Sequence, residues 1–81
     1  MYEYLSGRLK QLGIRQMDLT GVLGLKPASI SHRFTGRTDW SLHEMYKLME
    51  VCRADMSELH IYFPPPDVGQ KRASWHHLNG A

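Results

Sequence analysis

The stretch that decides the fold runs from Gln16 to Arg37 and reads QMDLTGVLGLKPASISHRFTGR. It holds two segments with apolar residues at helical spacing, and Gly24 lies in the short connection between them. Pro27 suits the first position of the second helix, because the amide that proline lacks would have no intrahelical partner there. Gly36 suits the end of that helix, because glycine readily adopts the left-handed conformation. The spacing therefore predicts a helix-turn-helix unit.

The two helices of this unit are predicted over Gln16–Leu23 and over about 27–35. The predicted inward residues are Leu19, Val22 and Leu23 on the first helix, then Leu25, Ile30 and Phe34. The predicted outward residues of the second helix are Pro27, Ala28, Ser29, Ser31 and His32. Small side chains let a helix approach a DNA major groove, and hydroxyl and imidazole groups can bond to base edges. We therefore favour base contacts over a merely polar helix surface for these five residues.

Apolar spacing also predicts a helix over about 2–12, with Leu5 and Leu9 facing inward and Gly13 ending it. Tyr2 and Tyr4 are compatible with either the core or its rim. Two further helices are predicted from their start signals.

The clearer start is Ser41, with Glu44 three residues later as a capping box. Trp40 and Met45 stand at the positions of a hydrophobic staple. The predicted buried face of this helix consists of Leu42, Met45, Leu48, Met49 and Cys52. A last short helix is expected from near Asp55, with Glu58 in the matching place, to Phe63.

The 81 residues suffice for one small domain. We expect five helices in residues 1–63 and a tail over 64–81 that begins with three prolines. Trp75 in this tail either docks on the body or a second subunit, or belongs to a disordered segment. A lone cysteine, Cys52, and the lack of an export signal or a membrane span predict a cytoplasmic protein.

Charge is unevenly distributed along the chain. Residues 1–40 carry six Lys or Arg and three Asp or Glu, whereas residues 41–66 carry two and four. The basic first part suits a polyanionic partner, although an asymmetry this small by itself favours an ordinary solvated surface. No catalytic triad, paired carboxylates or phosphate-binding glycine loop occurs, so no enzyme, cofactor, metal or small-molecule ligand is predicted. We interpret Cys52 as a buried, unreactive thiol, and His43 and His60 as surface residues.

The sequence resembles the XRE-like family, the lambda and 434 repressor and Cro type of domain, most closely the single-domain phage regulators of Gram-positive bacteria. The resemblance spans about residues 3–63 and rests on LGIRQMDL (12–19), LGL (23–25), SIS (29–31) and FTGRTDWSLHEM (34–45). It implies a five-helix lambda-repressor-like fold. It also implies that Gln16 bonds a phosphate and braces the recognition helix, that Ala28, Ser29, Ser31 and His32 read bases, and that Arg37 and Thr38 grip the backbone.

Three departures from the family pattern matter. Thr20 and Gly21 weaken the predicted first helix of the unit. Lys26 replaces a side-chain cap, and we hypothesise that a DNA phosphate caps the second helix instead. Arg33 replaces an apolar residue, and we expect it to point outward to a phosphate. The predicted backbone contacts are Arg15, Gln16, Lys26, Arg33, Arg37 and Thr38.

These features predict a sequence-specific double-stranded-DNA-binding regulator, a phage or prophage Cro-like repressor that covers an operator. Because one recognition helix reads few bases, we expect a homodimer on a palindromic operator. The predicted interface comprises Leu59, Ile61, Tyr62, Phe63 and Trp75. The alternative is a protein-interaction module of antirepressor or antitoxin type on the same scaffold.

Overall fold

The computed structural model describes residues 1–65, which contain five α-helices, two short 3-10 helices and no strand. The elements in chain order are α1 (Glu3–Gln11), η1 (Gln16–Asp18), α2 (Leu19–Leu23), α3 (Pro27–Phe34), α4 (Leu42–Val51), η2 (Met56–Glu58) and α5 (Leu59–Tyr62). The predicted all-helical class is confirmed, and the predicted ranges are close to these bounds. Trp75 and most of the predicted tail lie outside the described residues.

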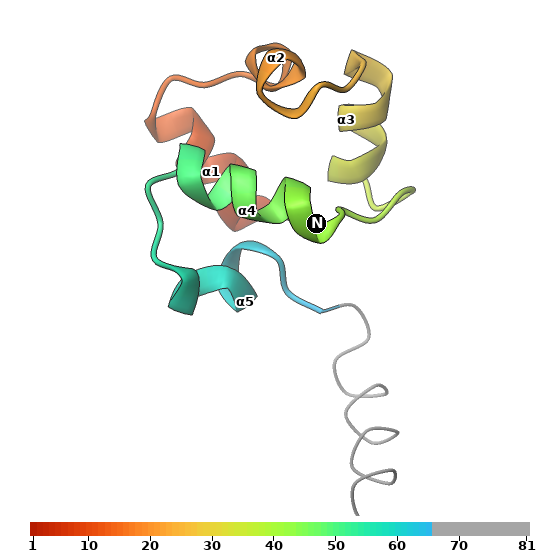
Figure 1. Cartoon of the computed structure of the whole chain (residues 1–81). Coiled ribbons are helices and arrows are strands. Elements are labelled where there is room, and N and C mark those ends of the chain that lie inside the picture. Colours follow the sequence, from red (N-terminus) through yellow and green to blue (C-terminus); the bar gives the residue numbers. More distant parts are fainter. Residues whose placement is uncertain (66–81) are drawn as a thin grey trace, which may run out of the picture.

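The helix α4 occupies the middle of the domain, with α2 and α3 on one side of it and α5 on the other (Figure 1). Contacts join α4 to both α2 and α5, and α1 also packs on α5. The helix α3 packs on η1 and α2, and Pro27, Ala28 and Ser31 on its outer side are exposed. One long side of α3 therefore remains uncovered by the other helices.

The core is a single cluster of apolar side chains drawn from all five helices and the segments between them. Its buried members are Leu5, Leu9, Leu19, Ile30, Phe34, Trp40, Leu48, Met49, Cys52, Tyr62 and Phe63. Leu19 of α2 and Ile30 of α3 are both fully buried, so each contributes about 1.5–3 kcal/mol of hydrophobic stabilisation. This pair holds α3 against α2.

Trp40 is the centre of an aromatic cluster that closes the core at the end of α3. Its ring lies edge-on to Phe34, with centroids 5.2 Å apart, and also contacts the rings of Phe63 and Tyr2. Tyr2 therefore belongs to the aromatic cluster. Tyr4 is half exposed, and its ring packs edge-on against Tyr62 at 4.9 Å.

The helices α1 and α4 end in the same type of turn. In each, one residue is left-handed and the following amide bonds to a carbonyl five residues earlier: Ile14 N to Leu9 O at 2.9 Å, and Ala54 N to Met49 O at 3.0 Å. The left-handed residue is Gly13 (φ 74°) after α1 but Arg53 (φ 55°) after α4. Because a side chain is disfavoured in this conformation, the turn at Arg53 is strained.

Two residues predicted to face inward are exposed. Leu42 is 56% exposed and Val22 is 39% exposed. Leu42 lies at the edge of the apolar stripe of α4, in the first turn, where no neighbouring element covers it. In the five-residue α2, the side that meets the core is centred on Leu19 and Leu23, which leaves Val22 outside it.

Candidate nucleic-acid interface

The outward face of α3 carries small and polar side chains above an apolar base. Pro27, Ala28 and Ser31 are exposed, whereas Ser29 and His32 are partly covered. On the opposite face, Ile30 is fully buried and Phe34 is 8% exposed. The five side chains predicted to contact bases therefore lie on one helix that is anchored in the core, and three of them are exposed.

The beginning of α3 has no side-chain cap. Lys26 stands at the N-cap position in an extended conformation, and its side chain accepts no hydrogen bond. Pro27 occupies the first turn, as predicted. The remaining amides of the first turn have no partner within the helix, and Lys26 next to them is exposed. This end of α3 carries a partial positive charge in addition to that of the lysine.

The loop after α3 is fixed by the carbonyl oxygen of His32, which accepts three hydrogen bonds. The donors are the amide of Arg37 at 2.9 Å, the amide of Thr38 at 3.3 Å and the hydroxyl of Thr35 at 3.1 Å. Gly36, with φ 84°, allows this reversal of the chain. Arg37 and Thr38 are held next to the end of α3 with exposed side chains.

The expectation that Arg33 points outward is wrong. Its Nε donates to Glu44 Oε1 at 2.9 Å, its side chain is 16% exposed, and its Nη1 donates to the carbonyl of Ser29 at 3.0 Å. The position lies on the side of α3 that faces the start of α4, where Glu44 supplies a carboxylate. Burial raises the pKa of Glu44, but hydrogen bonds from the Ser41 amide and from Arg33 outweigh it and leave that pKa below its ordinary value.

Thr35 extends the exposed ridge of α3 and was not among the predicted contacts. It follows Ser31 by four residues, so the two side chains lie on the same side of the helix, and both are exposed. The helical spacing from Ser31 was the available signal. We add Thr35 to the candidate surface.

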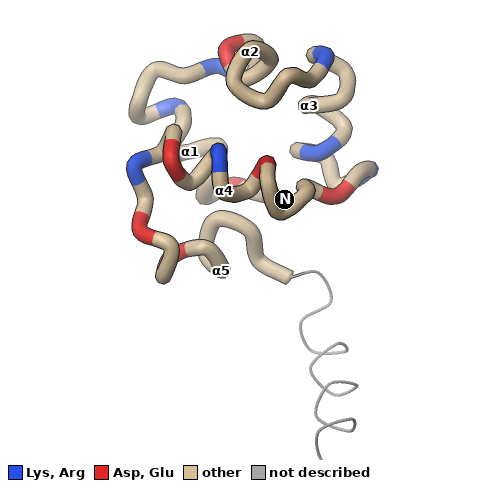
Figure 2. Tube along the Cα trace, in the orientation of Figure 1, with Lys and Arg blue, Asp and Glu red and all other residues tan. Residues whose placement is uncertain are grey.

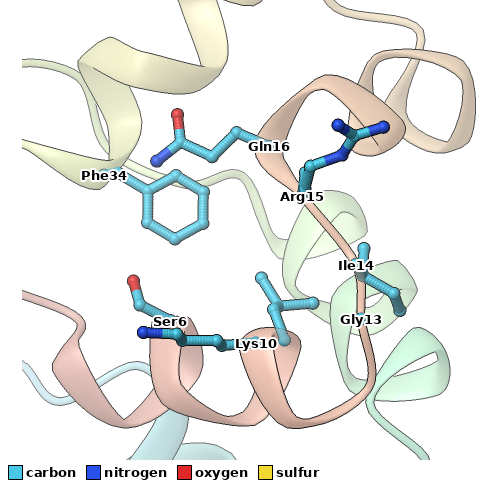
Figure 3. Close-up of a pocket in the computed structure, with 8 residues that line it drawn as sticks. Ser6, Lys10, Gly13, Ile14, Arg15, Gln16 and Phe34 are labelled. Atoms are coloured by element: carbon cyan, nitrogen blue, oxygen red, sulfur yellow. The ribbon is translucent and has the colours of Figure 1, made fainter.

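Basic residues border α3 at its beginning, in its last turn and in the loop that follows, as Figure 2 shows along the trace. Arg15 and Gln16, at the start of η1, are also exposed. Figure 3 shows the Gln16 side chain beside the ring of Phe34, so Gln16 lies next to the end of α3. Of the predicted backbone contacts, Lys26, Arg37 and Thr38 thus lie at the ends of α3 and Gln16 lies beside its last residue, whereas Figure 3 shows the Arg15 side chain pointing away from Phe34.

The predicted dimer interface needs correction. Tyr62 is 3% exposed and Phe63 is 9% exposed, because both pack into the core of their own chain. Leu59 is partly buried against the same core, and Ile61 is 41% exposed. Of the predicted interface residues, Ile61 is the one whose side chain is substantially available on α5, and Trp75 lies outside the described range.

The remaining candidate groups show no reactive arrangement. Cys52 is fully buried, and burial raises the pKa of its thiol, partly opposed by Arg8, whose Nε donates to the Cys52 carbonyl at 3.2 Å. His43 and His60 are exposed. Within residues 1–65, no three metal-ligating side chains are grouped together.

Comparison of the chain with protein-family models, with curated proteins and with solved structures finds no match. The resemblance to the XRE-like family therefore stays a prediction. None of the helices in residues 1–65 has the length and apolar character that a membrane crossing requires.

Proposed function

We propose that this domain binds double-stranded DNA by inserting α3 into the major groove, as a sequence-specific transcriptional regulator of the Cro type. The observation that carries the proposal is the exposed ridge of α3, whose small and polar side chains stand on the buried Ile30 and Phe34. Under this proposal, α2 and α3 act as a helix-turn-helix of lambda-repressor type.

The composition of the ridge suits direct readout. Pro27 and Ala28 have little bulk, so the backbone of α3 can come close to the bases. Ser31 and Thr35 offer hydroxyl groups, and His32 offers an imidazole at the edge of the ridge. A good pair of hydrogen bonds to one base contributes roughly 1–3 kcal/mol of discrimination against the wrong base.

Both ends of α3 suit phosphate binding. At the beginning, uncapped amides and Lys26 offer an anion site. At the end, Arg37 and Thr38 are fixed by the carbonyl of His32. Gln16 lies near the end of α3, beside Phe34. Such contacts set the position and angle of the helix on the duplex.

The regulator is proposed to act as a homodimer, because an eight-residue recognition helix contacts few base pairs. Two copies would read half-sites about 34 Å apart on one side of the duplex. Exposed Ile61 on α5, supported by Leu59, is the proposed centre of the contact. Blocking polymerase access to such an operator would repress transcription.

The test is selection of bound sequences from a random duplex pool, followed by binding measurements at several salt concentrations. A palindromic consensus and an affinity that falls steeply with salt are the expected results. A pool that shows no enrichment, together with salt-independent binding, would refute the proposal.

A second candidate function is docking of a partner protein, which the exposed Met17 and Val22 beside α2 favour. Met17 is 64% exposed, although it is apolar. A docking module would bind neither random nor selected duplexes tightly, so the same experiment distinguishes the two functions.

A further inference from the structure

An open groove of about 340 Å³ lies between α1, the segment that follows it and the end of α3. Its volume is at the lower end of the range for small-molecule sites, roughly 300–1,000 Å³. Figure 3 shows the lining side chains: Ser6 and Lys10 rise from α1, and Phe34 and Gln16 lie across from them. None of the residues of the exposed ridge of α3 lines the groove, whereas Gln16, a proposed phosphate contact, does.

The floor of the groove is apolar and firmly held. It consists of Leu9, Ile14 and Phe34. Leu9 is 3% exposed and Phe34 is 8% exposed, so both are fixed in the core, and Ile14 packs against the same cluster. A flat apolar group of a ligand would cover mainly Ile14, together with the small parts of Leu9 and Phe34 that still meet solvent.

The rim of the groove carries hydrogen-bond donors that the chain itself does not use. Within residues 1–65, the side chains of Ser6, Lys10 and Gln16 form neither a hydrogen bond nor an ion pair with the protein. They offer a hydroxyl, an ammonium and an amide, and Figure 3 shows the ends of Ser6 and Lys10 close together on α1 and the Gln16 amide on the opposite side, beside Phe34. Such donors complement an oxygen anion.

The ion pair between Arg15 and Asp18, which is the nearest to the groove, does not neutralise the positive charge of Lys10. Arg15 also lines the groove, and its Nε lies 3.9 Å from Asp18 Oδ2 with both side chains largely in solvent. The same Asp18 oxygen accepts the backbone amide of Arg15 at 2.8 Å, so this carboxylate is directed at the start of η1. Lys10 remains without an acidic partner in the described part of the chain.

We propose that this groove binds a small organic carboxylate with an apolar body of roughly ten non-hydrogen atoms, such as an aromatic monocarboxylate. The ring covers Leu9, Ile14 and Phe34, and the carboxylate accepts hydrogen bonds from Lys10 and Ser6. Because the groove is half open, the affinity is modest, with a Kd on the order of 1 mM.

Occupation of the groove would also affect DNA binding, a consequence that rests on the proposed function. Gln16 borders the groove and is a proposed phosphate contact. The carboxylate, held across the groove by Lys10 and Ser6, adds a negative charge that opposes the approach of a phosphate to Gln16. The ligand therefore lowers the affinity for DNA.

The test is a titration of the full-length protein in solution, in which NMR spectra record the chemical shifts of the backbone amides at each ligand concentration. Benzoate is the probe, and benzyl alcohol and inorganic phosphate are the comparison compounds. Benzoate is expected to shift the amides of Gly13, Ile14 and Gln16 saturably. Benzyl alcohol, which lacks the charge, should bind about fivefold more weakly, and phosphate, which lacks the ring, should not saturate.

Two variants make the test specific. Lys10→Gln should weaken benzoate binding about fivefold, whereas Lys47→Gln, an exposed lysine on α4, should leave it unchanged. The proposal would be overturned if benzoate did not saturate, or if benzyl alcohol or phosphate bound as tightly as benzoate. It would also be overturned if Lys10→Gln bound benzoate with the affinity of the unmodified protein. Because the titration contains no DNA, its outcome is independent of the proposed regulator function.

Discussion

Arg33 and Glu44 join α3 to α4 through one short ion pair, with Arg33 Nε 2.9 Å from Glu44 Oε1. The same carboxylate oxygen accepts the backbone amide of Ser41 at 3.0 Å. One oxygen thus serves both the cap of α4 and the tie to α3. Because the two side chains are only 16% and 12% exposed, salt screens this pair less than a surface pair.

We expect a double-mutant cycle of Arg33→Met and Glu44→Gln to give a coupling free energy of about 1–2 kcal/mol, because the pair is charged and largely removed from water. Urea unfolding of the four proteins measures it. The cycle of Arg15→Ala and Asp18→Ala is the control, since that pair is longer and exposed; its coupling should stay below about 0.5 kcal/mol. Equal couplings in the two cycles would contradict a special role for Arg33.

The stability of the domain is expected to decrease in acid, partly through Glu44. Its folded-state pKa lies below the ordinary value of 4.5, so the unfolded chain takes up a proton first as the pH falls. The stabilisation is fully present well above pH 4.5 and is lost as the pH falls through the folded-state pKa. Glu44→Gln should flatten the dependence of the unfolding free energy on pH between about 5 and 3.

Some pH dependence should remain in that variant, because hydrogen bonds also lower the pKa of Asp55 and of Glu3. Asp55→Asn therefore serves as the comparison at an exposed site, with a smaller expected effect. A Glu44→Gln profile parallel to that of the unmodified protein would show that this carboxyl does not contribute.

Replacing Arg53 by glycine is expected to stabilise the domain by about 1 kcal/mol, because glycine adopts φ 55° without the steric cost of a side chain. For a domain of this size, that gain raises Tm by roughly 4–8 °C. Gly13→Ala places a side chain in the equivalent turn of α1 and should lower the stability by a similar amount. Thermal unfolding followed by circular dichroism measures both changes.

Substitutions on the two kinds of proposed DNA contact should differ in their effects. Lys26→Ala or Arg37→Ala should weaken binding to all duplexes. Each substitution should also reduce the slope of log affinity against log salt concentration by about one. Ser31→Ala should instead relax preference at particular base pairs and leave the salt dependence unchanged. Binding isotherms on the selected consensus and on scrambled duplexes separate these outcomes, and the reverse pattern would mean that α3 docks differently.

The proposed dimer contact is tested at Ile61. Ile61→Lys should give a monomer that retains its helical content, because this side chain is 41% exposed and contributes little to its own core. Tyr62→Lys should unfold the chain instead, since Tyr62 is almost fully buried. Leu42→Lys, at an apolar position on α4 that is 56% exposed, should leave the dimer intact. Sedimentation of the variants decides the assignment.

The helix positions could be predicted because their signals are local. The capping box of Ser41 and Glu44 is formed by reciprocal bonds of 3.1 and 3.0 Å, and the box at Asp55 is also present. The glycine that ends α1 has the expected left-handed conformation. Each of these features depends on a few neighbouring residues, so the sequence is sufficient to locate it.

The errors concern residues whose surroundings come from distant parts of the chain. Arg33 was expected in solvent because the carboxylate that binds it lies 11 positions later. Phe63 and Tyr62 were expected at an interface, but the aromatic rings of Trp40 and Tyr4 cover them within the same chain. Local spacing gives the side of a helix but does not identify what packs against it.

Because Glu44 both caps α4 and pairs with Arg33, it links the opening of the first turn of α4 to the opening of the last turn of α3. If the first turn of α4 frays, the carboxylate that binds the Ser41 amide moves away, and Arg33 loses its partner in the same event. The last turn of α3 and the first turn of α4 thus open as one cooperative unit, and their amides should exchange hydrogen at matching rates. Anything that orders α3 from outside would slow exchange at the start of α4 as well.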